Sequence, residues 1–400
     1  MNRELTRREV LLGAGALMAL PALPAWATAP APQSGRVAVA KCKTYGPELL
    51  PALSKIFDQL GGLDRLVKGK TVAVKINLIG VRSQRLGSAL MEDTFWTHPH
   101  VIGSVVHLMG KAGARRIRVV EGPWSSPETL EEVMLSMNWK PQDILNAAGN
   151  VEFENTNYLG RGKKYARLMV PSGGLIYPGY DLNHSYEDCD VFVSCAKLKE
   201  HAATGVTLSM KNVYGSTPVT IYGEGAGVDE PSIRPHGGRG NVFHFATRVP
   251  SKSAPQQMDM SLPKDAGFRL PRIVSELNSA RPVHLAIIDG IKTATGGETA
   301  GGGAKAAVNP GVIIAGTNTV ATDAVAMTVM GFDPLAEKGK APFARCDSTL
   351  LFGEQLGVGI RDLKKNEILG VPVADVIFSY PAVREKLGPP QGGPGGGRKG

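Results

Sequence analysis

Cysteine is scarce in this chain of 400 residues, which contains only Cys42, Cys189, Cys195 and Cys346. No C-x-x-C motif is present, and no Cys/His run has the spacing of a zinc site. We therefore expect no iron–sulfur cluster, because such clusters use closely spaced cysteines. A strand between Cys189 and Cys195 would hold them roughly 20 Å apart, too far for a disulfide. The sequence leaves open whether Cys42 and Cys346 meet.

Several common functional motifs are also missing. The chain has no Gly-x-Ser-x-Gly elbow and no His-Glu-x-x-His pair, which disfavours two classes of hydrolase. The Gly-rich run at 296–303 lacks both the Gly-Lys-Ser/Thr ending of a P-loop and the helix of a dinucleotide-binding turn. The net charge of +9 suits an anionic ligand or surface. Without a recognisable DNA- or RNA-binding pattern, we expect no nucleic acid partner.

The two ends of the chain differ in composition from the rest. Residues 1–29 carry Arg7 and Arg8 ahead of a weakly apolar stretch and end in small residues, the pattern of a twin-arginine signal peptide. It predicts export to the periplasm; an uncleaved amphipathic anchor is the alternative. No other apolar run approaches 20 residues, so we expect no transmembrane segment in the mature chain. Residues 389–400 are Gly-rich and are expected to be a disordered tail.

Apolar segments of strand and helix type alternate along residues 30–388, which predicts an α/β domain, either one large domain or two lobes. The strand at 71–77, the helix at 101–112 and the strand at 117–120 form a βαβ unit, so the sheet should be mostly parallel with flanking helices. A helix is also expected at 51–66. The segment 216–263 has little periodicity and is predicted to be a long loop insertion, either a functional cover or a partly disordered insertion.

Residues 190–215 concentrate cations behind an apolar strand. The run 191–193 predicts a fully buried strand of a parallel sheet. Lys197, Lys199 and His201 follow at two-residue spacing, so an extended backbone would project them from one side. Ligands of open α/β sheets bind at the carboxyl ends of the strands, which favours a binding site here. A solvated rim is the alternative interpretation.

Neighbouring segments add to this candidate site. After a break at 204–205, a helix is expected to carry Lys211 and Asn212, and its N-terminal N–H groups would favour an anion. The strand at 71–77 delivers Lys75 and Asn77 at its own end. We therefore expect these side chains to bind a carboxylate or phosphate together with the cations of the first segment.

The stretch DVFVSCAKLKEHAATGVTLSMKNVYG closely resembles the signature of domain-of-unknown-function family 362. The shared features are an apolar strand, a K-x-K-x-H segment and a K-N-x-x-G segment. Further matching pieces lie at 74–77, 98–99, 112–114, 287–290, 315–316, 321–324 and 331–334, and the resemblance extends from about residue 72 to 370. It implies a fold and a set of recurring polar residues but no reaction. Many members carry ferredoxin-type cysteine runs, which this chain lacks.

Three carboxylates are candidates for the same site. Asp289 follows an apolar strand and Asp323 lies near a helix start, so both are predicted to face the lysines as metal or hydroxyl partners; equally, they form a turn and a helix cap. Glu121, at a strand end, is a candidate general base or a loop cap. His98 and His100 supply two of the ligands that a metal needs, with Asp93 or His244 as a guessed third, or they mark a helix entry, which is the simpler interpretation.

The sequence therefore predicts an exported protein that binds a small anionic ligand at the strand ends. As an enzyme, it would hold the ligand with its lysines and move protons with His201, Lys211 or Glu121. The alternative is a non-catalytic exported accessory protein that binds a metal, a cofactor or a partner protein. An enzyme should have a closed pocket containing an acid or base of shifted pKa, whereas a binding module should present an open basic face.

Overall fold

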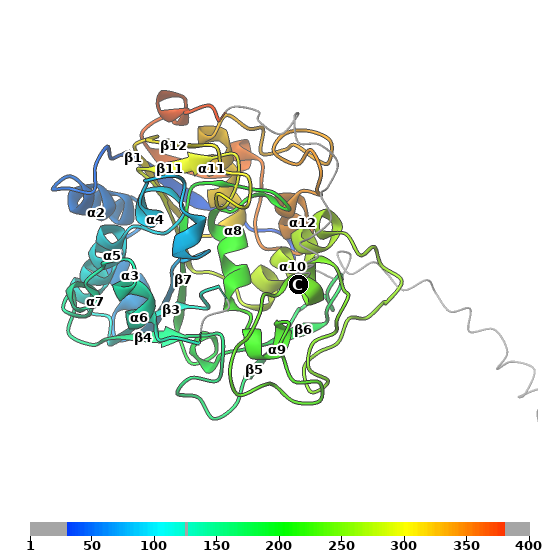
Figure 1. Ribbon diagram of the computed structural model, residues 1–400. Helices are drawn as coiled ribbons and strands as arrows, with labels where there is room; N and C mark the ends of the chain where they lie inside the picture. Colours follow the sequence, from blue (N-terminus) through cyan, green and yellow to red (C-terminus); the bar gives the residue numbers. More distant parts are fainter. Residues whose placement is uncertain (1–29, 125–126, 381–400) are drawn as a thin grey trace, which may run out of the picture.

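The computed structural model describes residues 30–124 and 127–380. Within these residues an eight-stranded sheet forms the centre, in the order β14-β1-β13-β10-β7-β2-β3-β4 (Figure 1). Its strands are β1 (Arg36–Lys41), β2 (Thr71–Lys75), β3 (Arg116–Glu121), β4 (Val151–Asn155), β7 (Val191–Lys197), β10 (Leu285–Gly290), β13 (Val312–Gly316) and β14 (Glu367–Gly370). Among them β13 alone runs antiparallel to its neighbours, so the sheet is mostly parallel. The predicted fold class is confirmed.

Strand β7 lies in the interior of the sheet and is buried along its whole length. Val191, Val193 and Cys195 enter the apolar core on one face, while Phe192 and Ala196 enter the core on the other. This two-sided burial explains the continuous apolar run, because neither face of the strand meets water. The predicted buried strand is confirmed and extends to Lys197.

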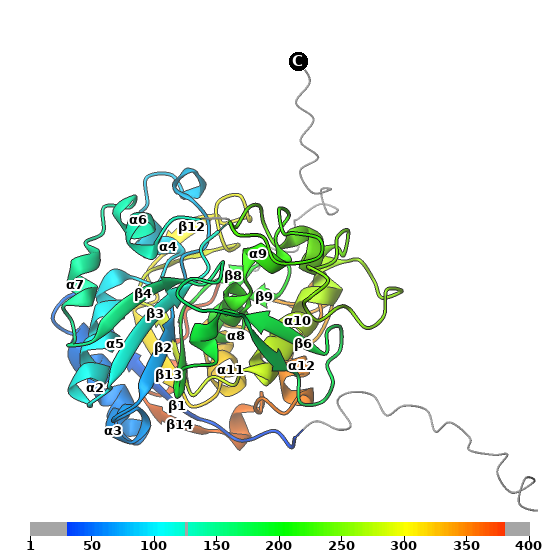
Figure 2. The same ribbon diagram turned by 90° about the horizontal axis from the view of Figure 1, so that it is seen from below.

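Helices cover both faces of the sheet, giving three layers (Figures 1 and 2). On one face are α2 (Leu49–Gln59), α3 (Leu63–Val67), α5 (Pro99–Lys111), α6 (Leu130–Leu135) and α7 (Pro141–Leu145). The other face carries α8 (Leu208–Val213), α10 (Ala266–Ala280), α11 (Thr319–Val329) and α12 (Thr349–Gln355). No helix among the described residues is long and apolar enough to cross a membrane.

The predicted βαβ unit is confirmed, since β2 and β3 pair in parallel and α5 connects them. The single helix expected at 51–66 is wrong, because the chain forms α2 and α3 with a break between them. Gly61 and Gly62 lie at the break with φ of 109° and 88°. A right-handed helix cannot continue through a positive φ, and glycine adopts that conformation without a steric penalty.

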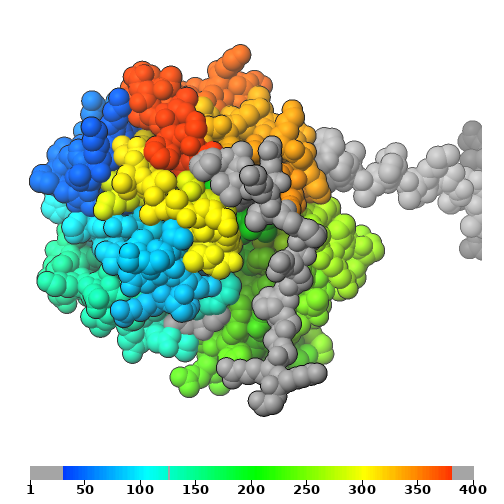
Figure 3. All heavy atoms as spheres, turned by 45° about the horizontal axis from the view of Figure 1, so that its top comes forward, coloured from blue at the N-terminus to red at the C-terminus, as the bar shows by residue number. Residues whose placement is uncertain are grey.

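Several small elements surround the sheet. Three are two-stranded hairpins, formed by β5 (Ala166–Met169) with β6 (Gly179–Leu182), β8 (Glu200–His201) with β9 (Gly205–Val206), and β11 (Thr293–Thr295) with β12 (Ala306–Val308). The Gly-rich run 296–303 joins β11 to β12. Figure 3 shows this hairpin, in yellow, beside the cyan segment that contains α4 (Met91–Thr94), and the Thr293 hydroxyl donates to the Thr94 carbonyl. The long segment 216–263 contains α9 (Val219–Tyr222) and a π-helix at Gly240–His244.

Candidate functional site

A cavity of about 1040 Å³ opens at the carboxyl ends of β2, β3 and β7. The long segment 216–263 and the Gly-rich run 296–303 contribute further parts of its wall. Seven of the ten predicted site residues line it, namely Lys75, Asn77, Glu121, Lys199, His201, Lys211 and Asn212. Lys197, Asp289 and Asp323 do not. The structure therefore brings most of the predicted set to one place.

Lys75 and Glu121 form a buried ion pair on the cavity floor, with 2.6 Å between Nζ and Oε1. Each is the last residue of its strand, β2 or β3. The Glu121 carboxylate also accepts hydrogen bonds from the backbone N–H groups of Leu78 (2.9 Å) and Gly122 (2.8 Å). Burial lowers the pKa of Lys75, and the Glu121 charge opposes this shift. Glu121 thus accepts from three donors, and these contacts hold the ends of β2 and β3 together.

Two side-chain amides extend this network towards Lys199. The Asn77 amide donates to Asn212 Oδ1 (3.0 Å), and Asn212 in turn donates to the Lys75 carbonyl (3.2 Å). Asn77 Oδ1 then accepts a hydrogen bond from Lys199 Nζ at 3.0 Å. Both amides are buried, so this chain of contacts fixes how the strand end and α8 face each other.

Lys199 is fully buried and has no carboxylate within ion-pair distance in the described part of the chain. Besides Asn77, its ammonium contacts the Phe95 carbonyl at 2.7 Å. Burial lowers its pKa well below the usual range; the Glu298 charge opposes this shift, and the charges of Lys197 and Lys211 add to it. An anion in the cavity would stabilise the charged form of this side chain.

Lys211 and Arg239 both lie over the ring of Tyr214. Lys211 Nζ is 3.9 Å from the ring centroid, and the centre of the Arg239 guanidinium is 6.0 Å from it. Lys211 is half-buried, and within the described ranges its side-chain amine forms no hydrogen bond or ion pair. Burial lowers its pKa to about 7; the Glu298 charge opposes this shift, while Arg239 and Lys75 add to it. A lysine in this state can exchange a proton near neutral pH.

His201 lines the cavity from the β8–β9 hairpin. Its Nδ1 accepts a hydrogen bond from the Ala203 N–H at 3.1 Å. A neutral imidazole whose Nδ1 accepts must carry its proton on Nε2, so His201 has a donor on its other nitrogen.

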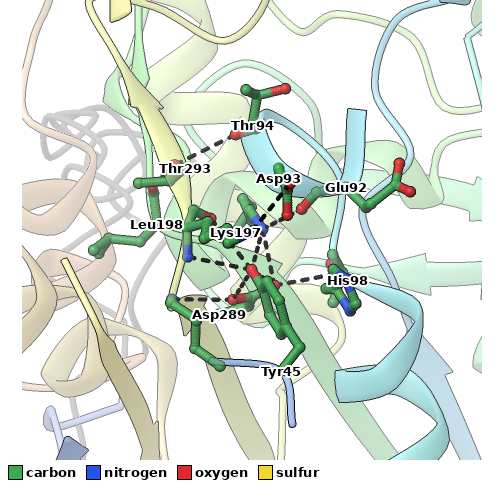
Figure 4. A network of polar contacts seen from close by, with 12 residues as sticks. Tyr45, Glu92, Asp93, Thr94, His98, Lys197, Leu198, Asp289 and Thr293 are labelled. Carbon is green, nitrogen blue, oxygen red and sulfur yellow. Dashed lines mark hydrogen bonds and ion pairs between the residues drawn. The ribbon is translucent and has the colours of Figure 1, made fainter. Parts of the chain in front are cut away.

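Lys197 belongs to a separate buried network (Figure 4). Its ammonium contacts Asp289 Oδ2 at 2.9 Å, the Tyr45 hydroxyl at 3.0 Å and the Glu92 carbonyl at 2.7 Å. Asp289 also accepts hydrogen bonds from the Tyr45 hydroxyl (3.0 Å) and the His98 N–H (3.0 Å). Lys197 lies opposite Asp289 in the register of β7 and β10, so the two predicted ligand-binding residues are each other's partners.

Asp323 caps α8 from a neighbouring helix. Its carboxylate accepts hydrogen bonds from the N–H groups of Ser209 (2.8 Å) and Met210 (2.9 Å), and burial raises its pKa to about 7. These N–H groups were expected to face an anionic ligand, and that expectation is wrong because Asp323 occupies them. The predicted position of Asp323 beside the lysines is likewise not observed, since it does not line the cavity.

His98 and His100 were predicted either to bind a metal or to mark the start of a helix, and the structure places them at the start of α5. His98 caps α5 and accepts a hydrogen bond from the His100 N–H at 3.1 Å, while its ring stacks on Tyr45 with centroids 3.5 Å apart. Within residues 30–124 and 127–380, no group of three or more His, Cys, Asp or Glu side chains is placed to hold a metal ion. Cys189 and Cys195 are not joined by a disulfide.

The sequence did not single out several cavity residues that come from loops. Glu298 is one: its Oε2 accepts from the Ala202 N–H at 3.0 Å, while Glu200 accepts from the Gly296 N–H, and these two contacts tie the Gly-rich run to the K-x-K-x-H segment. Outside the loops, Thr207 and Tyr214 each line the cavity with a buried hydroxyl that has no hydrogen-bond partner among the described residues. The same holds for Nδ1 of His244, which the sequence suggested only as a third metal ligand. The sequence did show the Gly-rich run and the long insertion as loops. Neither has the regular spacing of apolar residues that would indicate which side chains point into the cavity.

The comparisons with known proteins give a family and one distant relative. The model of the family described as Domain of unknown function (DUF362) matches residues 72–328. A curated thylakoid-associated protein of Synechocystis is 26% identical over 173 residues, which make up 42% of this chain and 46% of that relative. The match thus spans about half of the relative's length. No solved structure matches the chain.

Proposed function

The chain belongs to the family named Domain of unknown function (DUF362), and we propose that it binds a small organic anion, carrying a carboxylate or phosphate, in the cavity at the strand ends. The observation that carries this proposal is the Lys199 ammonium, which is fully buried and has only neutral partners in the described structure. A buried charge costs free energy unless an opposite charge compensates it, and the lowered pKa of Lys199 shows that this compensation is missing among the described residues. An anionic ligand would supply that compensation.

The charges around the cavity support the same proposal. Glu121 is engaged by Lys75, so the remaining cations are Lys199, Lys211 and Arg239. Two carboxylates, Glu224 and Glu298, face them. With all three protonated, the cations exceed these carboxylates by one, and inside a cavity their charges are screened less than in bulk water. Such an excess favours a ligand of negative charge.

We further propose that the protein is an enzyme that moves protons with Lys211 or His201. The site is a cavity of about 1040 Å³ rather than a flat basic face, and it contains a lysine with a pKa of about 7, which fits an enzyme better than a binding module. The accessory-protein alternative draws on the relative, whose name records an association with thylakoids. Turnover of any bound anion would favour the enzyme, whereas binding without turnover would favour the accessory role.

We also propose export to the periplasm by the twin-arginine route. The support is Arg7 and Arg8 ahead of a weakly apolar stretch. These positions lie outside the described residues.

Calorimetric titration with sulfate, phosphate and pyruvate tests the binding proposal. Lys199→Met removes the buried ammonium at similar volume and should weaken anion binding by about 1.5–3 kcal/mol, or tenfold to more than a hundredfold. Lys111→Met, on the exposed side of α5, is the matched control and should bind as the wild type does. Circular dichroism would establish that both variants are folded. Equal affinities for Lys199→Met and the wild type would refute the proposal.

A further inference from the structure

The amine of Lys211 is placed differently from the other lysines of the cavity. Lys75 is engaged by Glu121, and Lys199 by Asn77 and the Phe95 carbonyl. Lys211 instead rests over the Tyr214 ring and has no hydrogen-bond or ion-pair partner in the part of the chain that the structure describes. Its nitrogen is therefore available to a molecule in the cavity.

The helix that carries Lys211 is held at both ends. Asp323 caps the N-terminus of α8 through Ser209 and Met210, and Asn212, next to Lys211, is bonded to Ser194 Oγ at 3.0 Å. The base of the lysine side chain is thus fixed relative to the strand ends. A nucleophile benefits from such a fixed position, because the reacting atoms are already aligned when the substrate binds.

Arg239 offers an anchor for a carboxylate beside this amine. Its Nε donates to the Thr217 carbonyl (2.6 Å) and its Nη2 to Asn157 Oδ1 (2.6 Å). Its remaining nitrogen, Nη1, makes no hydrogen bond to any described residue. Arg239 and Lys211 flank the same ring, so a substrate carboxylate at the guanidinium would bring its adjacent carbon towards the lysine.

We propose that Lys211 forms an imine with the carbonyl group of a 2-oxo acid whose carboxylate is held by Arg239 and Lys199, an inference that rests on the anion binding proposed above. Lysines that are partly withdrawn from water and lie beside other cations are suited to this chemistry, because the uncharged amine is the nucleophile. The low pKa of Lys211, about 7, means that half of the amine is uncharged near neutral pH.

The reaction balances without an oxidant or reductant. The uncharged Lys211 amine adds to the carbonyl carbon, and the C=O π electrons move to oxygen. The nitrogen passes a proton to that oxygen, giving a carbinolamine. The C–O bond then breaks, the hydroxyl leaves as water with the remaining N–H proton, and the nitrogen electron pair forms the carbon–nitrogen double bond. The buried hydroxyls of Thr207 and Tyr214 line the cavity and have no hydrogen-bond partner among the described residues. They are therefore available to donate a hydrogen bond to the departing oxygen.

Reductive trapping tests this inference on the full chain. The protein is incubated with pyruvate, 2-oxoglutarate or phenylpyruvate and sodium cyanoborohydride, and the products are measured by intact mass and peptide mapping. We expect one adduct, on the peptide that contains Lys211, with at least one of the three acids. Lactate, which has a hydroxyl in place of the ketone, should give none, and excess sulfate should suppress the adduct by competing for the anion site.

The variants separate the possible outcomes. Lys211→Arg keeps the cation but has no nucleophilic amine, so it should bind pyruvate and sulfate yet give no adduct, whereas Lys111→Arg should react as the wild type does. Should Lys211→Arg fail to fold, the peptide map of the wild type still locates the reacting lysine. Sulfate binding without any adduct, or an adduct on other lysines, would overturn the imine and leave the proposed function intact. Failure to bind any anion would overturn both.

Discussion

The Lys75 ammonium lies 2.6 Å from the Glu121 carboxylate, directly against the backbone of Gly215. A Cβ atom at position 215 would lie 2.8 Å from Lys75 Nζ and 3.0 Å from Glu121 Oε1. Real Cβ atoms almost never approach other atoms so closely. This contact gives a physical reason for the glycine that ends the K-N-x-x-G segment: the ion pair fills the space a side chain would need.

Gly215→Ala should therefore destabilise the protein by about 1–3 kcal/mol, because a methyl group would overpack a buried ion pair. It should also weaken anion binding, since Lys75 and Asn212 line the cavity. Gly103→Ala in α5 is the matched control: its Cβ would meet nothing within 4 Å, and alanine favours a helix by about 1 kcal/mol over glycine. Urea denaturation measures both. Equal stability of the two variants would contradict the packing argument.

Lys197→Met should act on stability rather than on ligand binding. It leaves Asp289 buried without its cation, which costs about 3–5 kcal/mol. Adding Asp289→Asn should recover part of this loss, because the second change removes the uncompensated charge. Anion affinity of the folded protein should stay near the wild-type value, in contrast to Lys199→Met. A large loss of affinity with unchanged stability would show that Lys197 belongs to the binding site after all.

Lys197 and Lys199 show how far the sequence could predict the site. Alternation along an extended backbone indicated correctly that the two side chains belong to the same strand end. It could not show that Lys197 stands in register with Asp289, because Asp289 is 92 positions away in the sequence and their pairing depends on sheet topology. Residues far away in the sequence therefore determine that Lys197 is neutralised by a carboxylate while Lys199 lines the cavity.

The scaffold was more predictable than the loops. Strand β7 is buried on both faces, so its apolar run identified it, whereas the edge strand β14 has no fully buried residue and no such pattern. Arg239 lies in a segment without periodicity, and contacts with Thr217 and Asn157 determine its position. Residues positioned by tertiary contacts leave no local signal.

Export can be tested independently of the fold. Replacing Arg7 and Arg8 together by lysine should leave the precursor in the cytoplasm, because the twin-arginine pattern is the export signal we infer. Cell fractionation and immunoblotting measure the distribution. The control replaces Arg115 and Arg116 by lysine. It makes the same double substitution, with the same unchanged net charge, within the folded part of the chain. An unchanged periplasmic yield of the signal variant would contradict the proposal.

The pH dependence of anion binding should follow Lys211. Its pKa is about 7 in the cavity, and a bound anion would raise that pKa by stabilising the ammonium. Affinity should therefore be highest below pH 7 and fall as pH rises, by at most about tenfold per pH unit, until the pKa of the complex is passed.

Sulfate is the suitable probe for this measurement, because it does not titrate between pH 6 and 9. Lys211→Arg should keep a high affinity across this range, since a guanidinium stays charged. If the wild type and Lys211→Arg had the same pH profile, Lys211 would not be the titrating group in the site.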